Sequence, residues 1–131
     1  MQHIEDNEQM ILIRWAQFES GRHPELSLLF HVPNGGKRSK VEAARFKAMG
    51  VQAGVPDLFL PVPRGAYHGL FIEMKAPKGR TSDAQNTWIE KLKNNGYAVE
   101  VCYGFEAAQQ TLLSYPVSYT HLRAHETGAY L

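Results

Sequence analysis

The spacing of hydrophobic positions changes along the chain, and each spacing predicts an element. Residues 5–19 place apolar side chains three and four positions apart, which predicts an amphipathic helix with one apolar stripe, formed by Ile11, Leu12, Trp15 and Phe18. Residues 39–49 and 82–94 are predicted helices because each begins at a serine and is followed by a glycine. Residues 105–113 form the last predicted helix.

Short apolar segments between these helices predict four strands, over residues 28–32, 57–60, 70–75 and 97–103. Residues 61–69 are rich in proline and glycine, which indicates a hairpin loop between the second and third strands. The predicted order is α-β-α-β-β-α-β-α. This order favours an α/β fold with a mixed β-sheet flanked by helices.

Length and composition indicate one globular domain. The chain has 131 residues, of which 44% are hydrophobic and 21% charged. The single cysteine, Cys102, excludes an internal disulfide, and no apolar run approaches the length of a membrane span, so we expect a cytoplasmic protein. We expect the domain to cover residues 1–115. Residues 116–131 have no clear period and resemble translated sequencing-adaptor read-through; the alternative is a genuine C-terminal extension, and we place no function there.

The net charge of +1 conceals an uneven distribution. Residues 37–80 hold nine basic and three acidic residues, a net charge of +6, whereas the rest of the chain carries −5. Charge clustering alone is equally typical of a solvated helix face and of a surface for a polyanion.

The candidate chemistry lies on the two central strands. Glu73 and Lys75 are two residues apart in a strand, so their side chains share one face. If the two strands pair as a hairpin, Asp57 at the start of one lies beside Glu73 at the end of the other. Converging carboxylates favour a hard divalent cation, Mg²⁺ or Mn²⁺. The alternative is a solvent-facing Glu–Lys pair and an aspartate that caps a turn after Pro56.

Several sequence blocks resemble one nuclease family. Pro56-Asp57 followed by Glu73-Met74-Lys75 is similar to the PD-(D/E)xK signature of restriction-endonuclease-like nucleases. More specifically, blocks across residues 3–115 resemble the small stand-alone, phage-type form of the VRR-NUC family; these are Glu8-Gln9, His31 to Arg38, Met49 to Leu58, Gly69 to Lys75, Ser82 with Gln85 and Trp88, and Gly96-Tyr97.

The resemblance implies a role for each matching position. Asp57 and Glu73 are implied to hold Mg²⁺ or Mn²⁺, with the Met74 backbone carbonyl as a third ligand, and Lys75 is implied to be the catalytic lysine. The implied reaction is hydrolysis of a phosphodiester by in-line attack of water, leaving 5′-phosphate and 3′-hydroxyl ends.

Two further residues receive roles from the resemblance, and each has a rival role. Glu8 is implied to contact the metal through water; the rival role is an ordinary exposed helix residue. Gln85 is implied to lie beside the catalytic site. It also stands three residues after Ser82, the spacing of a helix capping box. We expect the two roles of Gln85 to coexist only if its side chain is not committed to the backbone.

Phosphate contacts require cations and free backbone donors. Glycines and cations follow one another after Pro33, and further cations flank the candidate site. The predicted DNA-binding residues are Asn34, Gly35, Gly36, Lys37, Arg38, Lys40, Arg45, Lys47, Lys78 and Arg80. The alternative for the first stretch is a plain turn between a strand and a helix. His31 is a secondary candidate, whereas Trp15, Trp88 and Cys102 are expected in the core.

The leading hypothesis is a metal-dependent DNA endonuclease of a bacterial or phage-infected cell. The resemblance points to Holliday-junction-like or flap DNA as the substrate. Cutting both strands of a branched junction needs two active sites, so we expect a homodimer. The first alternative is a catalytically silent DNA-binding or interaction protein that keeps the fold. A metal-dependent phosphoesterase for small molecules is a weaker alternative, because the +6 segment suits a longer polyanion.

Overall fold

The structure is a computed structural model that describes residues 2–33 and 39–115, the first two by their backbone alone. Its elements in chain order are α1 (Gln2–Glu19), the 3-10 helix η1 (Pro24–Leu28), β1 (Phe30–His31), α2 (Lys40–Ala48), β2 (Leu58–Leu60), β3 (Leu70–Lys75), α3 (Asp83–Asn94), β4 (Ala98–Tyr103) and α4 (Phe105–Ser114). The predicted order of helices and strands is confirmed, and η1 is an addition to it. The predicted DNA-binding residues 34–38 and the tail 116–131 lie outside the described residues.

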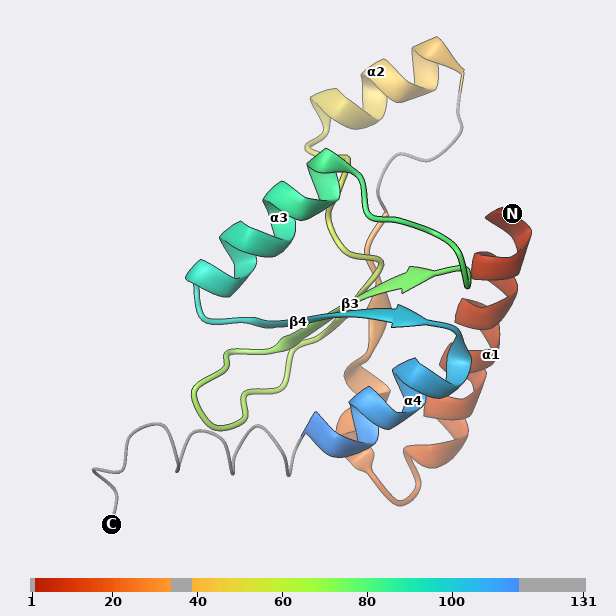
Figure 1. The fold of residues 1–131 in the computed structure, drawn as a ribbon, viewed down its shortest axis with the longest axis vertical. Coiled ribbons are helices and arrows are strands. Elements are labelled where there is room, and N and C mark those ends of the chain that lie inside the picture. The colour runs from red at the N-terminus through yellow and green to blue at the C-terminus, as the bar shows by residue number, and fades with distance from the viewer. Residues whose placement is uncertain (1, 34–38, 116–131) are drawn as a thin grey trace.

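The four strands form one mixed sheet in the order β1-β2-β3-β4. The pairs β1–β2 and β2–β3 are antiparallel, whereas β3 and β4 are parallel. A parallel pair needs a crossover connection, and α3 provides it (Figure 1). The predicted mixed sheet with flanking helices is therefore confirmed.

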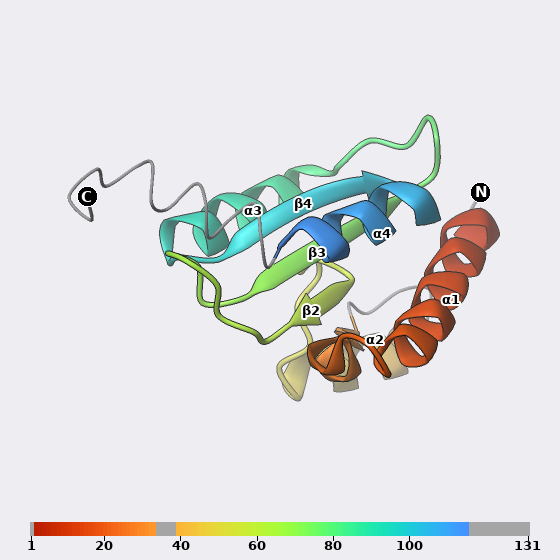
Figure 2. The ribbon, with the colours of Figure 1, turned by 90° about the horizontal axis from the view of Figure 1, so that it is seen from below.

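The two faces of the sheet meet different helices. Strand residues alternate between faces, so Leu58, Ile72 and Met74 lie on one face, where they form the buried core with Leu12 of α1 and Leu112 of α4. Figure 2 shows α4 and α3 on opposite sides of the sheet at β4. The second face is therefore the one that α3 covers.

Aromatic rings occupy much of this second face. Phe59 of β2 and Phe71 of β3 are register partners, and their rings stack with centroids 4.2 Å apart. Tyr97 contacts both rings edge-on. Glu73 and Lys75 follow Phe71 at two-residue steps and share its face. The candidate catalytic residues thus extend the α3 side of the sheet.

Two expectations about local structure are wrong. Ile11 and Phe18 were expected on the core stripe of α1, but they are 48% and 83% exposed. Leu12 and Ala16 are the buried residues of α1, and Ile13 and Trp15 pack against the core. The sheet and α4 meet the side of the helix defined by the i, i+4 pair Leu12 and Ala16, which turns Phe18 to solvent. The strand expected over residues 28–32 is reduced to β1, because η1, with a proline in its first turn, takes up Leu28.

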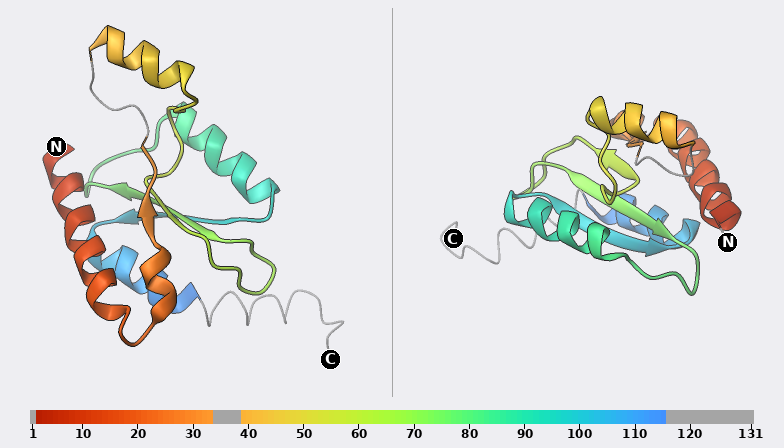
Figure 3. Two further views of the ribbon diagram at one scale, coloured as in Figure 1. Left: turned by 180° about the vertical axis from the view of Figure 1, so that it is seen from behind. Right: turned by 90° about the horizontal axis from the view of Figure 1, so that it is seen from above.

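Helix α2 stands beyond the edge of the sheet (Figures 1 and 3). None of its nine residues is buried. Its ends carry the predicted local signals: Ser39 Oγ accepts a 3.1 Å hydrogen bond from the Glu42 N–H, and Gly50 follows the helix with φ +98°. Capping rather than core packing thus defines α2. Within the described part of the chain, no helix has the length and hydropathy needed to span a bilayer.

Candidate active site

The two candidate carboxylates lie side by side at one edge of the sheet. Leu58 pairs with Ile72, so the next antiparallel step sets Asp57 opposite Glu73. Asp57 Oδ2 accepts a 2.8 Å hydrogen bond from the Met74 N–H, which holds the side chain against the end of β3. The predicted convergence of Asp57 and Glu73 is confirmed.

Burial makes negative charge costly at this site. Glu73 is only 2% exposed. Loss of hydration, together with the nearby charge of Asp57, raises the pKa of Glu73 to about 8. Loss of hydration also raises the pKa of Asp57, although the hydrogen bond from Met74 acts in the opposite direction. The pair therefore needs positive charge before both carboxylates ionise at neutral pH.

Lys75 supplies part of that charge. Its Nζ lies 3.5 Å from Glu73 Oε2, and its side chain is 9% exposed. The ammonium group lowers the pKa of Glu73, but burial and Asp57 outweigh it. One lysine thus faces two carboxylates, and ionisation of both leaves an excess negative charge.

Gln85 of α3 contacts the carboxylate pair directly. Its Nε2 donates a 3.0 Å hydrogen bond to Glu73 Oε2. Its Oε1 accepts a 2.8 Å hydrogen bond from the Ser82 N–H, and Ser82 Oγ accepts one from the Gln85 N–H, which completes a capping box. The expectation that a backbone-committed Gln85 cannot also reach the site is wrong, because an amide has an acceptor end and a donor end.

One fully buried side-chain atom of the site has no hydrogen-bond partner among the described residues. Glu73 Oε1 is fully buried and unpaired, whereas Oε2 meets Gln85 and Lys75. An unpaired buried carboxylate oxygen is costly, and a hard cation coordinates such oxygens readily. Strand residues turn N–H and C=O to the same side, so the Met74 carbonyl also points toward Asp57. These oxygen donors fit Mg²⁺ or Mn²⁺.

Glu8 lies at the same end of the sheet but makes a contact that the sequence did not indicate. Its Oε1 accepts a 2.9 Å hydrogen bond from the Phe105 N–H, the first backbone donor of α4. The described residues contain no group of three or more His, Cys, Asp or Glu side chains gathered for a metal ion. Glu8 is therefore not a third direct carboxylate beside Asp57 and Glu73.

His31 and Gln9 join the site from β1 and α1. His31 Nδ1 lies 2.9 Å from the Asp57 carbonyl oxygen and 3.1 Å from Gln9 Nε2. The Asp57 carbonyl only accepts, so this contact uses a proton on Nδ1, whereas a Gln9 amide N–H needs Nδ1 as an acceptor; the tautomer of His31 decides which of the two contacts is a hydrogen bond. Sequence reasoning gave Gln9 no role, because the contact spans 22 residues and depends on how α1 crosses β1.

The predicted DNA-binding cations that the structure describes lie in two places. Lys40, Arg45 and Lys47 are exposed on α2, and Lys78 and Arg80 are exposed in the loop between β3 and α3. This loop leaves β3 directly after Lys75 (Figure 1). Both groups therefore flank the carboxylate pair along the chain, one before Asp57 and one after Glu73.

A mixed sheet that brings an aspartate, a glutamate and a lysine together at the ends of two strands defines a restriction-endonuclease-like domain. The model of the VRR-NUC domain matches residues 4–106. A solved structure described as a VRR_NUC domain protein is 36% identical and superposes with a TM-score of 0.71, over 86% of this chain and 87% of the other. None of the curated proteins matches this chain. The chain belongs to the VRR-NUC family, and its function is of the nuclease type.

Proposed function

We propose that this protein is a DNA endonuclease that uses Mg²⁺ or Mn²⁺ to hydrolyse phosphodiester bonds. The observation that carries the proposal is the buried Asp57–Glu73 pair, in which Glu73 Oε1 has no hydrogen-bond partner among the described residues and Lys75 lies 3.5 Å from Oε2. Membership of a nuclease family supports the same reaction class.

The proposed metal ligands are Asp57, Glu73 and the Met74 carbonyl, with Glu8 linked through water. When bound, a divalent cation supplies positive charge to the reacting phosphate and lowers the pKa of water. Asp57 is held in place by the Met74 N–H, and Glu73 by Gln85. These hydrogen bonds fix both carboxylates before substrate arrives.

Lys75 is the proposed catalytic lysine. The Lys75 ammonium group is buried beside Glu73, and the two side chains lie on the same face of β3. From there it can hold the attacking water or stabilise the charge that develops on the phosphate. Gln85 keeps the Glu73 carboxylate in one orientation, which leaves Oε1 directed away from the amide.

The proposed substrate is DNA, with a preference for branched forms such as four-way junctions and flaps. Exposed cations on α2 and in the loop after β3 support phosphate contact. Two strands of a junction require two active sites, so we propose a homodimer as the working form.

The test uses purified protein with synthetic four-way junctions, flaps and linear duplex, each with Mn²⁺ and with EDTA. Asp57→Asn and Glu73→Gln should each reduce cleavage at least about 100-fold, since both remove a metal ligand. Asp83→Asn is the matched control, because Asp83 is an exposed carboxylate at the start of α3. Absence of cleavage by the wild type, or equal cleavage by the site variants, would refute the proposal; DNA binding without cleavage would support the silent DNA-binding alternative.

A further inference from the structure

An apolar groove lies next to the carboxylate pair, on the same face of the sheet. Phe71 on its floor precedes Glu73 by two residues on β3, and Trp88 on its wall follows Gln85 by one turn of α3. The groove has a volume of about 380 Å³. Two lining residues of the groove, Phe71 and Trp88, are therefore neighbours of the site residues Glu73 and Gln85 along β3 and α3.

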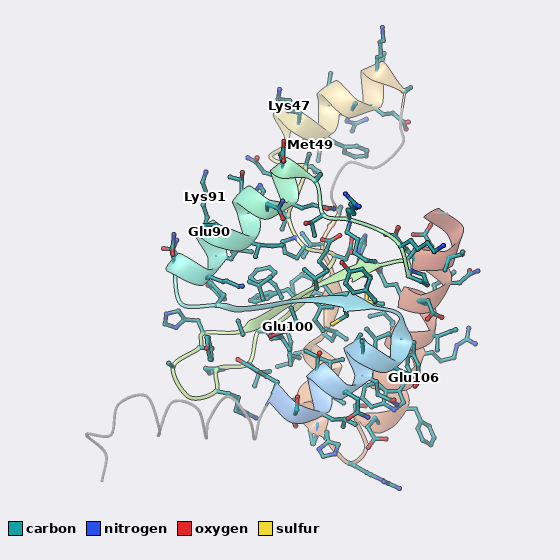
Figure 4. The ribbon with its side chains drawn as sticks, in the orientation of Figure 1. Lys47, Met49, Glu90, Lys91, Glu100 and Glu106 are labelled. Carbon is teal, nitrogen blue, oxygen red and sulfur yellow. The ribbon has the colours of Figure 1, made fainter. Side chains whose placement is uncertain are left out.

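Four segments build the groove: Phe71 of β3, Val32 and Pro33 after β1, the segment after α2, and α3. Trp88 and Leu92 of α3 form one wall, and the segment after α2 forms the other. Gly54 seats this segment against α3, because a Cβ at Gly54 would lie only 2.7 Å from the Ala84 backbone. Met49, which is 68% exposed, lies at the rim where α2 meets α3 (Figure 4).

The lining suits a flat ring with polar edges. None of the described lining residues is charged, and Gln52 is the one whose side chain is an amide. Bases of single-stranded nucleic acid stack on aromatic side chains, and Trp88 and Phe71 are the aromatic residues of this lining. The expectation that Trp88 lies in the core is wrong: it is half-buried on the α3 side of the sheet and outside the core cluster.

The groove lies beside cations that match a phosphate backbone. Lys47 projects from α2 near Met49 (Figure 4), and Arg45 is exposed on the same helix. A two-fold dimer through this groove would bring two copies of these cations together, whereas DNA neutralises them. Charge therefore favours a nucleic-acid occupant over a second copy of the chain.

We propose that the groove binds an unpaired base of the DNA substrate, next to the phosphate presented to Asp57 and Glu73. This proposal rests on the proposed nuclease function and concerns its choice of substrate. A flap or junction offers an unpaired base at the branch, whereas a continuous duplex must first unstack one. The groove thus selects branched DNA.

Trp88 fluorescence reports the occupant. The sequence holds two tryptophans, and Trp15 packs against Phe105 of α4 on the opposite side of the sheet, so Trp15→Phe leaves Trp88 as the sole reporter. We titrate this variant in EDTA with a 5′-flap oligonucleotide and with a duplex of the same sequence, and follow binding separately by anisotropy. The flap should quench Trp88 at least about twofold more than the duplex at equal saturation. Equal quenching, or binding without quenching, overturns the proposal.

An exposed pair of variants separates the groove from general electrostatics. Met49→Glu adds a negative charge at the rim, and Val41→Glu adds the same charge on α2, where Val41 is 80% exposed. Met49→Glu should weaken flap binding about tenfold more than duplex binding, whereas Val41→Glu should weaken both equally. Equal effects of the two glutamates overturn the proposal. The proposal is also overturned if Met49→Glu changes the oligomeric state measured by sedimentation and the flap causes no selective quenching of Trp88. That result would indicate that a second copy of the chain occupies the groove.

These outcomes also distinguish the two proposals. Flap-selective quenching in a protein that cleaves no DNA would sustain the base groove and reject the nuclease proposal. Cleavage that depends on Asp57, without flap-selective quenching, would do the reverse.

Discussion

Glu73 is the side chain on which most interactions of the site meet. Its Oε2 receives the Gln85 amide and lies near the Lys75 ammonium, while Oε1 is buried and lacks a partner among the described residues. A carboxylate so buried beside Asp57 gains stability either by binding a proton or by binding a cation. Its environment therefore couples protonation, metal binding and folding.

The metal-free protein should lose stability as the pH rises toward 8. The pKa of Glu73 is raised from 4.5 to about 8 in the folded state. The folded state therefore holds more protons than the unfolded state between these values, and the free energy of unfolding falls as the pH rises through this window. Each unit of pKa difference corresponds to about 1.4 kcal/mol.

Thermal unfolding in EDTA from pH 4 to pH 9 measures this effect. The Tm of the wild type should fall more steeply with pH than that of Glu73→Gln, which cannot titrate at this position. Mn²⁺ should restore the wild-type Tm at pH 8 and have little effect on the variant. Parallel curves for the two proteins would show that Glu73 does not titrate as described.

Gln85→Glu separates helix capping from catalytic positioning. A capping box accepts glutamate as well as glutamine, so α3 keeps its N-terminal hydrogen bonds. The same change replaces the amide donor to Glu73 with a carboxylate. We expect cleavage to fall at least about tenfold, measured as kcat under saturating Mn²⁺, with helical circular dichroism unchanged.

Gln85→Ala is the companion variant. It removes both hydrogen bonds of the side chain and should also lower the free energy of unfolding by about 1 kcal/mol. Wild-type cleavage by Gln85→Glu would show that Gln85 only caps α3 and does not position Glu73 for catalysis.

Among the helices, α2 differs most from the rest. Eight of its nine residues are exposed and Phe46 is half-buried, and its net charge of +2 comes from Lys40, Arg45 and Lys47 against Glu42. Most helices gain stability by packing an apolar face, and α2 has no such face in the core. A helix of this kind is suited to contact a partner, and its charge indicates a polyanion.

Removal of cations from α2 should change the salt dependence of DNA binding. Arg45→Gln combined with Lys47→Gln should reduce the slope of log K against log salt concentration by about 2, roughly one unit for each phosphate that the protein no longer neutralises. The Tm should stay constant, since both side chains are exposed.

Lys93→Gln is the matched control for this pair. Lys93 is an exposed cation in the last turn of α3 and should leave the slope unchanged. An unchanged slope in the α2 variant would exclude Arg45 and Lys47 from the DNA contact.

At the scale of the whole molecule, hydrogen bonds join parts of the chain that are distant in the sequence. Glu8 of α1 receives the Phe105 N–H of α4, 97 residues later, and Tyr115 donates a 2.6 Å hydrogen bond to the Val62 carbonyl. Gly104 makes room for Glu8, since a Cβ there would lie 3.2 Å from Glu8 Oε1. The first helix thus joins the last one beside the candidate active site.

Glu8→Gln tests whether this contact is structural alone. The glutamine oxygen still accepts from Phe105, so the free energy of unfolding should fall only by about 1 kcal/mol, through the loss of a negative charge at the N-terminus of α4. If Glu8 also holds a metal-bound water as proposed, the loss of its charge should lower cleavage at least about tenfold and weaken Mn²⁺ binding in a calorimetric titration. Unchanged cleavage and Mn²⁺ affinity would restrict Glu8 to capping α4.

Much of the fold was readable in the order of residues. Serine caps at Ser39 and Ser82 and the glycine after α2 mark helix ends through contacts three or four residues long. Apolar runs ended by proline and glycine marked β2 and β3. Given that hairpin, the spacing of Asp57 and Glu73 was enough to place the two carboxylates opposite each other.

Other features depend on packing between distant segments. Periodicity put Phe18 on the core stripe, yet the way α1 lies against α4 and the sheet turned it outward and buried Ala16. The contacts of Glu8 with Phe105, of Gln9 with His31 and of Gln85 with Glu73 join different elements. Local patterns specify backbone conformation because their hydrogen bonds close within a few residues. Side-chain partners and the apolar groove exist only once the elements meet, so they were set by the folded arrangement.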